Sequence, residues 1–229
     1  MFNDFLATFS QQLTPQMWGV VATATYETIY ISFASTLLAV VVGVPVGVWT
    51  FLTGKNEILQ NNRTHFVLNT IINIGRSIPF IILLLILLPV TRFIVGTVLG
   101  TTAAIIPLSI CAMPFVARLT ANALMEIPNG LTEAAQAMGA TKWQIVCKFY
   151  LPEALPTLIN GITLTLVTLV GYSAMAGTQG GGGLGSLAIN YGVYRNMPYV
   201  TWVATIIIVL FVMTVSYTHL RAHETTLHL

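Results

Sequence analysis

Charged residues are scarce in this chain of 229 residues, of which only 7% are Asp, Glu, Lys or Arg. Hydrophobic residues make up 55%, and the mean hydropathy is +0.82. Soluble domains carry about 25% charged residues, so this composition excludes a water-soluble domain of this length. The sequence predicts a protein that lives in a lipid bilayer.

Nucleotide-binding loops and paired cysteines are also missing. The sequence has no G-x-x-x-x-G-K-[ST] motif, whose backbone amides would cradle phosphates, and glycine-rich residues 177–185 do not follow a strand as such a loop must. Cys111 and Cys147 fall at different membrane depths, so we expect reduced packing residues and no disulfide. We expect no catalytic residue, metal site or bound cofactor in this chain, and any energy from ATP must come from a partner.

Five apolar runs are long enough to cross a hydrocarbon core about 30 Å thick, given a helical rise of about 1.5 Å per residue. These runs are 31–52, 66–91, 93–117, 155–177 and 199–217. The expected fold is all-α, a polytopic membrane protein with about five transmembrane helices. The second run leaves an alternative open, in which an interfacial helix precedes a shorter span.

Basic residues predict the orientation, because Lys and Arg near span ends stay on the cytoplasmic side. Six of them mark one side and two mark the other: Lys55, Arg63, Arg118, Lys142, Lys148 and Arg221 against Arg92 and Arg195. This distribution places the N-terminus outside and the C-terminus in the cytoplasm, with 1–22 as an outer segment and 23–217 as the transmembrane domain. The net charge of +2 reflects this excess and gives no reason to expect a nucleic-acid partner.

The longest polar stretch, residues 126–153, is thereby placed in the cytoplasm. Pro128 and Asn129 predict a break and a helix cap. The residues that follow form the i, i+3, i+4, i+7 stripe of a short amphipathic helix, made of Leu131, Ala134, Ala135 and Met138. Gly139 is expected to end this helix in a left-handed conformation.

A second short helix is predicted directly after this turn. Thr141 and Gln144 have the spacing of a capping box, and the apolar residues of this helix are Trp143, Ile145, Val146 and Phe149. Leu151-Pro152 is expected to stop it and turn the chain back toward the bilayer. Two interpretations remain open: a linker that rests on the membrane surface, or a docking element whose small alanines let another protein approach closely.

Glu133-Ala134-Ala135, followed by Gly139 and then Leu151-Pro152, resembles the cytoplasmic signature loop of the permease subunits of bacterial ABC importers. In that family the loop forms a coupling helix that docks in a groove of the ATP-hydrolysing subunit. Phe149 departs from the usual isoleucine but keeps the position apolar. The resemblance implies that the ATPase-coupling residues are Leu131, Glu133, Ala134, Ala135, Met138, Gly139, Ala140, Thr141, Gln144, Leu151 and Pro152.

Further segments narrow the resemblance to one branch. Residues 76–84, 122–128, 137–141, 151–156 and 168–175 look like the permease subunit of the methionine ABC importer. This branch implies the type I ABC importer permease fold, a homodimer in the bacterial inner membrane, two ATPase subunits that use ATP and Mg, and a substrate-binding lipoprotein outside. Another amino acid or small polar solute remains an alternative cargo. A channel or carrier that needs no nucleotide, or a membrane scaffold, remains the alternative from another class.

Six residues are candidates for the pathway or its gate: Arg76, Ser77, Tyr172, Ser173, Met175 and Gly177. Arg76 interrupts the second apolar run, where a guanidinium is costly unless it pairs, snorkels or faces water. It either lies deep and faces the pathway or anchors an interfacial helix. Polarizable side chains before the glycine-rich segment would suit a thioether amino acid. Residues 177–185 form either a flexible re-entrant loop or an outer gate.

The last residues, 218–229, end the apolar pattern abruptly. His219 and His223 have the i, i+4 spacing of two metal ligands on a helix. The abrupt change to polar residues favours the hypothesis that this tail is a cloning or sequence-assembly artefact. No function is therefore assigned to it.

Overall fold

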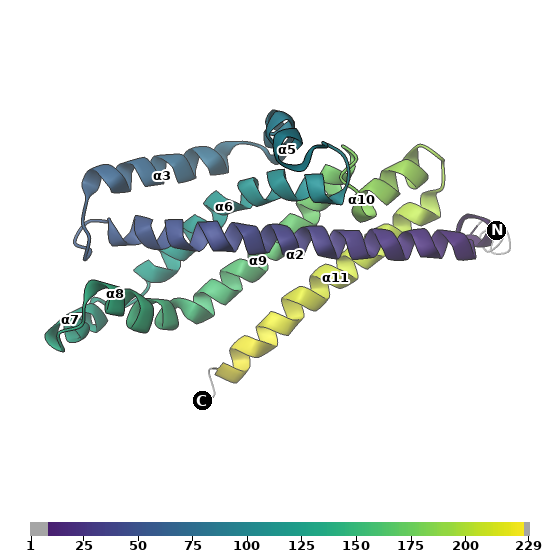
Figure 1. The fold of residues 1–229 in the computed structure, drawn as a ribbon. Helices are drawn as coiled ribbons and strands as arrows, with labels where there is room; N and C mark the ends of the chain where they lie inside the picture. The colour runs from purple at the N-terminus through teal and green to yellow at the C-terminus, as the bar shows by residue number, and fades with distance from the viewer. Residues whose placement is uncertain (1–8, 227–229) are drawn as a thin grey trace.

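The computed structural model describes residues 9–226 of the chain. Most of these residues are helical and none of them forms a strand, which confirms the expected all-α fold (Figure 1). In chain order the helices are α2 (Pro15–Leu52), α3 (Asn62–Ser77), α4 (Phe80–Ile86), α5 (Leu88–Val95), α6 (Thr101–Met125), α7 (Asn129–Ala137), α8 (Lys142–Ile145), the π-helical turn η1 (Val146–Tyr150), α9 (Leu151–Gly177), α10 (Gly183–Leu187), the π-helical turn η2 (Ala188–Val193) and α11 (Pro198–Thr226).

Four of the described helices are long and apolar enough to cross a membrane without a break. They are α2, α6, the continuous helix Lys142–Gly177 and the Pro198–Tyr217 part of α11. Helices α3 and α4 qualify together as a fifth span that is bent by 102°. The expected number of five spans is therefore reached when this broken pair counts as one.

The second expected span is broken at Ile78 and Pro79. Ile78 has an extended backbone, with φ −81° and ψ 122°, and Pro79 is the residue before α4. A proline disfavours the helical region for the residue before it and has no amide N–H of its own. This break excludes one continuous helix over 66–91 and agrees with the open alternative that the run holds two helical segments.

The third expected span, 93–117, is displaced along the chain. Residues 93–95 belong to α5, and α6 begins only at Thr101. Gly96 and Gly100 have φ angles of +82° and +95°, which interrupt a helix and which glycine adopts without steric cost. Hydropathy does not register this interruption, because the segment carries no charge.

Helix α2 begins at Pro15, well before the expected start at Ile31. The Thr14 hydroxyl caps it by accepting a hydrogen bond from the Met17 N–H at 3.3 Å. At about 1.5 Å per residue, its 38 residues extend for roughly 57 Å, which exceeds a hydrocarbon core of about 30 Å. Residues 15–22, expected as part of an outer segment, thus continue the first span as helix.

Helices α2 and α6 pack closely at the centre of the bundle. A Cβ atom at Gly43 would lie 2.7 Å from the Val116 Cβ, and one at Gly47 would lie 2.6 Å from the Thr120 Cβ. Larger side chains at these two positions would therefore force the helices apart. Helix α9 packs against both of them and completes the centre of the bundle (Figure 1).

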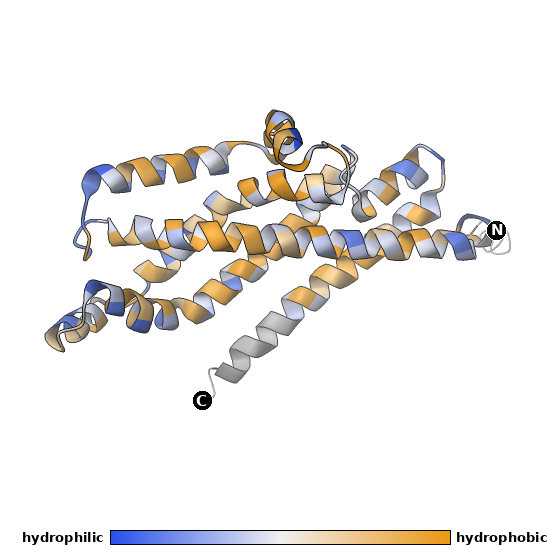
Figure 2. Ribbon diagram, in the orientation of Figure 1, coloured by the Kyte–Doolittle hydropathy of each residue, from blue (hydrophilic) through white to orange (hydrophobic). Residues whose placement is uncertain are grey.

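The buried apolar residues form three clusters, which include Leu108, Tyr150 and Leu184 respectively. Large apolar side chains also remain exposed along the helices, among them Phe33 and Leu37 of α2. Figure 2 shows that hydrophobic residues predominate along α2, α9 and α11. A surface of this kind is suited to lipid and to other membrane-embedded helices.

Candidate functional site

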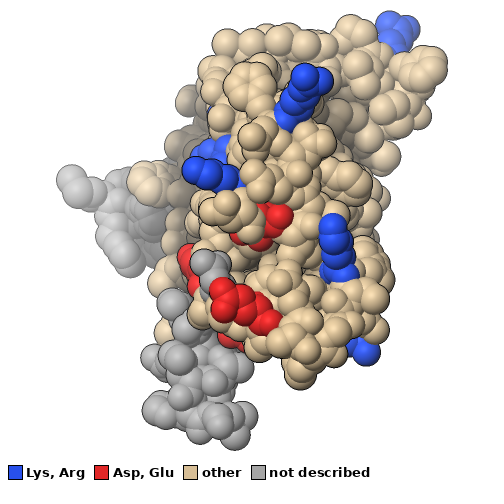
Figure 3. All heavy atoms as spheres, turned by 90° about the vertical axis from the view of Figure 1, so that its left-hand side faces the viewer, with Lys and Arg blue, Asp and Glu red and all other residues tan. Residues whose placement is uncertain are grey.

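Helices α7 and α8 form a compact element at one end of the molecule, beyond the ends of α6 and α9 (Figure 1). The connection between α2 and α3 lies at the same end, whereas the connection between α10 and α11 lies at the opposite end (Figure 1). Figure 3 views the first of these ends and shows acidic and basic side chains spread over it. The α7–α8 element therefore belongs to a polar end of an otherwise apolar bundle.

Helix α7 is fixed to the base of α9 by one apolar and one polar contact. Ala135 is fully buried in the cluster that includes Tyr150. The hydroxyls of Thr132 and Tyr150 form a hydrogen bond of 2.8 Å. The Phe51 ring of α2 packs edge-on against Tyr150 at 5.4 Å between ring centroids. A displacement of α7 must therefore also move α2 and α9.

The turn between α7 and α8 has the two features that the sequence predicts. Gly139 is left-handed with φ +75°, and the next amide, that of Ala140, donates to the Ala135 carbonyl at 3.0 Å. Thr141 and Gln144 form the capping box: the Thr141 N–H donates to Oε1 of Gln144 at 2.8 Å, and the Gln144 N–H donates to Oγ1 of Thr141 at 3.3 Å. Both predictions are confirmed.

Two predicted boundaries of this element are wrong. The N-cap residue of α7 is Pro128 and not Asn129. Leu151-Pro152 does not stop the second helix, since Lys142–Gly177 is continuous. The π-helical turn Val146–Tyr150 widens the backbone just before the proline. The missing amide of Pro152 then falls in the first turn of α9, where it is tolerated.

The predicted apolar stripe of α7 divides between two faces. Ala135 is fully buried and Leu131 is half-buried, whereas Ala134 is exposed and Met138 is 69% exposed. Trp143 of α8 is 75% exposed. Ala134, Met138 and Trp143 are termed the docking face below, because apolar side chains exposed at a polar end are typical of a protein contact.

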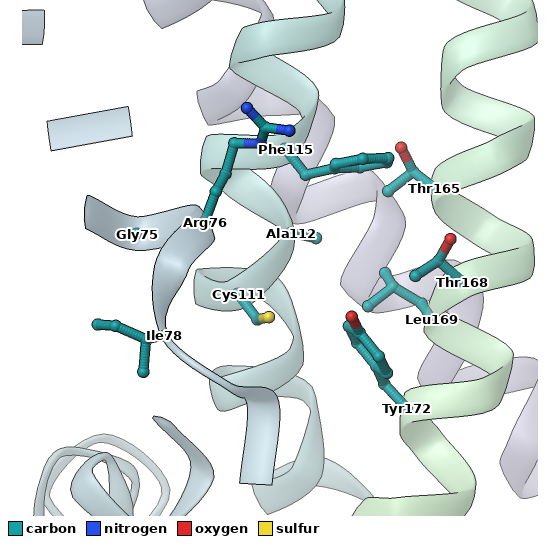
Figure 4. A pocket seen from close by; sticks show the side chains of 10 residues that line it. All are labelled: Gly75, Arg76, Ile78, Cys111, Ala112, Phe115, Thr165, Thr168, Leu169 and Tyr172. Carbon is teal, nitrogen blue, oxygen red and sulfur yellow. The ribbon is translucent and has the colours of Figure 1, made fainter. Parts of the chain in front are cut away.

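A cavity of about 220 Å³ lies between α3, α6 and α9 (Figure 4). Its lining residues are Gly75, Arg76, Ile78, Cys111, Ala112, Phe115, Thr165, Thr168, Leu169 and Tyr172. Arg76 and Tyr172, two of the six predicted pathway residues, are brought together here from α3 and α9. Figure 4 shows the Tyr172 ring extending from α9 toward α6, with Arg76 and Phe115 at the other end of the cavity.

The other four predicted pathway residues do not line this cavity. The hydroxyls of Ser77 and Ser173 donate to carbonyl oxygens of their own helices, at 2.7 Å and 2.8 Å. Met175 is partly exposed, and Gly177 is buried against residues 185–186. The geometry thus groups Arg76 with Tyr172 and separates both from the remaining candidates.

Eight of the ten lining residues were not among the predicted pathway residues, and Phe115, Thr165 and Thr168 are three of them. Phe115 follows Cys111 by four positions, and the two threonines precede Tyr172 by seven and four positions. Such spacing puts each set on one helical face. This spacing identifies cavity residues only when it is known which faces of α6 and α9 pack against each other.

Helix α3 is held against α6 on the side of Arg76. The Arg118 Nη2 donates to Oδ1 of Asn73 at 2.8 Å. A Cβ atom at Gly75 would lie 2.5 Å from Cγ of Pro114, so the glycine permits close approach of the two helices. These contacts fix the end of α3 that carries Arg76.

The glycine-rich segment is an ordered turn that leads into α10. The Gly183 N–H donates to a carboxylate oxygen of Glu27 at 2.7 Å, and the Leu184 N–H donates to the Thr28 hydroxyl at 2.8 Å. Gly180, Gly182 and Gly183 have φ angles between +75° and +81°. Both expectations for this segment, a flexible re-entrant loop and an outer gate, stay predictions. Glu27 was missed, although it is the only charged residue of α2.

The C-terminal tail adds no site to the described structure. Helix α11 continues to Thr226, but the side chains of 218–226 and residues 227–229 lie outside the described part. The predictions on 218–229, including His219 and His223, therefore stay untested. Among the described side chains, no group of three or more His, Cys, Asp or Glu could hold a metal ion.

Four unbroken spans, a broken fifth one and an extramembrane helix-turn-helix with an exposed apolar face define the class of polytopic transport permeases. The family model described as "Binding-protein-dependent transport system inner membrane component" matches residues 39–225. This chain belongs to that family, and it is a multi-pass inner-membrane component, as the resemblance implies. The match confirms the family that the signature loop indicates.

Curated relatives and solved structures agree with this assignment. The chain is 96% identical over 197 residues to the probable D-methionine transport system permease protein MetI of Haemophilus influenzae, covering 86% of this chain and 92% of that protein. It is 69% identical over 201 residues to its counterpart from Pasteurella multocida, covering 88% and 93%. A chain of the MetNI methionine ABC transporter in an inward-facing conformation superposes with a TM-score of 0.90 at 44% identity, covering 93% and 99%. The expected ABC importer permease fold is confirmed.

Proposed function

We propose that this chain is the membrane-spanning permease subunit of an ATP-driven methionine importer. The observation that carries the proposal is the 96% identity to the Haemophilus influenzae permease, which extends over 92% of that protein. The chain would form a homodimer, receive methionine from a substrate-binding lipoprotein outside, and bind two copies of an ATPase subunit in the cytoplasm. The N-terminus would face outside and the C-terminus the cytoplasm.

The docking face is the proposed contact with the ATPase subunit. Its apolar side chains, Ala134, Met138 and Trp143, are exposed, and Glu133 and Lys142 flank them with exposed charges. Apolar anchors surrounded by charges provide affinity at the centre of a contact and orientation at its rim. ATP and Mg would be bound by the partner, and this chain would carry out no bond chemistry.

Coupling would proceed through the continuous helix Lys142–Gly177. This helix begins in the docking element and includes Thr165, Thr168 and Tyr172, which line the cavity. Closure of the ATPase subunits would displace α7, and the contacts of Ala135 and Tyr150 would pass that displacement to the helix. The cavity would then open alternately to the two sides, a coupling of two sites through one conformational change.

Uptake by proteoliposomes tests the proposal directly. The permease, its ATPase subunit and the loaded binding protein are reconstituted, and accumulation of labelled methionine is followed with ATP inside and outside. ATP-dependent accumulation supports the proposal. Accumulation without ATP would indicate the channel or carrier alternative, and accumulation of another amino acid in place of methionine would indicate another cargo.

A further inference from the structure

We propose that the cavity between α3, α6 and α9 binds a free amino acid, whose carboxylate pairs with the Arg76 guanidinium. The inference rests on the proposed function and adds to it a binding site inside the permease. It follows from the charge of Arg76, from the depth of the cavity and from the chemistry of its other walls.

Arg76 carries a charge that the described chain does not neutralise. Among the described side chains, which leave out 129 and 218–226, no carboxylate lies within ion-pair distance of its guanidinium, and the Arg76 side chain is exposed. An unpaired guanidinium inside a membrane protein is costly unless it faces water or a ligand. Its planar fork of N–H donors matches a carboxylate with two parallel hydrogen bonds. A ligand with a free carboxylate would supply the missing anion.

The position of the cavity argues against an anchor for a lipid headgroup as the main role of Arg76. Cys111 and Ala112, which line the same cavity, lie at the middle of the 25-residue span α6. The middle of a hydrocarbon core of about 30 Å is roughly 15 Å from either headgroup layer. Helix α3 also packs along α6 and α2 instead of lying across the bundle (Figure 1). The cation therefore lies at one end of the cavity between α3, α6 and α9, where an amino acid could reach it.

The remaining walls suit the other two parts of an amino acid. The Tyr172 ring stacks on Phe80, with 4.8 Å between centroids and 1° between planes, and this contact fixes its orientation. Its hydroxyl has no hydrogen-bond partner in the described part of the chain, so it is free to accept one from an ammonium group. Phe115 and Cys111 offer polarizable surface for an apolar or thioether side chain. A volume of about 220 Å³ has room for one small amino acid.

Substitution of Arg76 tests the proposal in the reconstituted importer. Arg76→Gln removes the positive charge. Arg76→Lys keeps the charge but loses the planar pair of N–H donors that can bind both carboxylate oxygens. Loss of a charge-assisted hydrogen bond predicts that methionine uptake falls by about tenfold or more in the first variant and less in the second. Arg63→Gln is the matched control, since Arg63 is an exposed cation of the same helix outside the cavity. Co-purification with the ATPase subunit establishes that each variant assembles.

Labelling of Cys111 locates the ligand independently of uptake. Cys147 is exposed and is replaced by alanine, so that a methanethiosulfonate reagent reports on the cavity. Methionine is expected to slow the labelling of Cys111, while methionine methyl ester, which lacks the carboxylate, does not.

The outcomes separate this inference from the proposed function. Uptake by the unaltered importer together with full uptake by Arg76→Gln overturns only the inference. No uptake by the unaltered importer overturns the proposed function. A third outcome is that the loss of uptake in Arg76→Gln is absent in vesicles of neutral lipid, while methionine fails to protect Cys111 from labelling. That combination would assign Arg76 to a lipid phosphate and would also overturn the inference.

Discussion

The hydroxyl groups of Thr132 and Tyr150 lie 2.8 Å apart and join the short helix α7 to the base of the long helix α9. Tyr150 is almost completely buried and Thr132 is half-buried, so this hydrogen bond is partly buried. It forms the only polar link between α7 and η1 among the side-chain hydrogen bonds of the described residues. In the proposed function, this pair would connect the docking face with the helix that lines the cavity.

Removal of one hydroxyl from this pair is expected to weaken coupling without unfolding the protein. Tyr150→Phe keeps the ring and its contact with Phe51. A hydrogen bond contributes about 1 kcal/mol, so we expect ATP-driven methionine uptake to fall by roughly fivefold. Uptake by proteoliposomes measures this effect. The double variant with Thr132→Val is the control: its loss equals that of Tyr150→Phe if the bond carries the effect, and multiplied losses would contradict the prediction.

Gly139→Val is expected to leave the protein in the membrane but to uncouple it. Gly139 has φ +75°, and a β-branched residue is strained there by about 1 kcal/mol or more. The turn would reopen and move the docking face relative to α9. Uptake and substrate-stimulated ATP hydrolysis should both fall. Gly130→Ala is the matched control, because a Cβ atom there meets nothing within 4 Å, and equal losses in both variants would argue against this role of Gly139.

Glu133→Lys is expected to weaken binding of the ATPase subunit by reversing an exposed charge beside the docking face. Charges at the rim of a contact mainly affect orientation and association rate, and salt screens them. The amount of ATPase subunit that co-purifies should therefore fall most at low ionic strength. Gln136→Lys, on the same helix and also exposed, controls for added positive charge. An equal loss in both variants would indicate a general charge effect.

Glu27→Ala is expected to loosen the outer glycine-rich segment. It would leave the Gly183 N–H without its acceptor at 2.7 Å, and an unpaired buried amide costs about 1 to 3 kcal/mol. Hydrogen exchange of residues 182–187 should become faster, and the unfolding temperature should fall. Glu27→Gln keeps an acceptor oxygen and should lose less. Unchanged exchange in Glu27→Ala would show that the carboxylate does not hold this segment.

Glu57 predicts a pH-dependent stability at the end of the bundle that carries α7 and α8. Burial raises the pKa of this carboxyl above its ordinary value of 4.5, so its neutral form is favoured in the folded protein. Its favourable contribution is complete below pH 4.5 and is lost as pH rises through the folded-state pKa. Glu57→Gln should therefore raise the unfolding temperature at pH 7.5 but not at about pH 4. Equal shifts at both pH values would contradict this assignment.

Local signals in the sequence predicted the docking element well, because its turn depends on residues close together in the chain. The left-handed Gly139 and the Thr141–Gln144 capping box are set by the local backbone. The cavity was predicted only in part, since Arg76 and Tyr172 meet through packing of α3, α6 and α9. The break at Gly96 was missed, because hydropathy averages over it, whereas a division of the 66–91 run was left open as an alternative. What the sequence does not reveal directly is which helical faces meet.

The uninterrupted helix Lys142–Gly177 also constrains how the chain can change during evolution or in the laboratory. One residue inserted between η1 and Thr165 would rotate the cavity wall by about 100° relative to the docking element and shift it by about 1.5 Å. Substitutions along this stretch preserve the rotation of the cavity wall relative to the docking element, whereas insertions and deletions change it. Docking elements should therefore be exchangeable between related permeases only when the number of residues up to Tyr172 is kept.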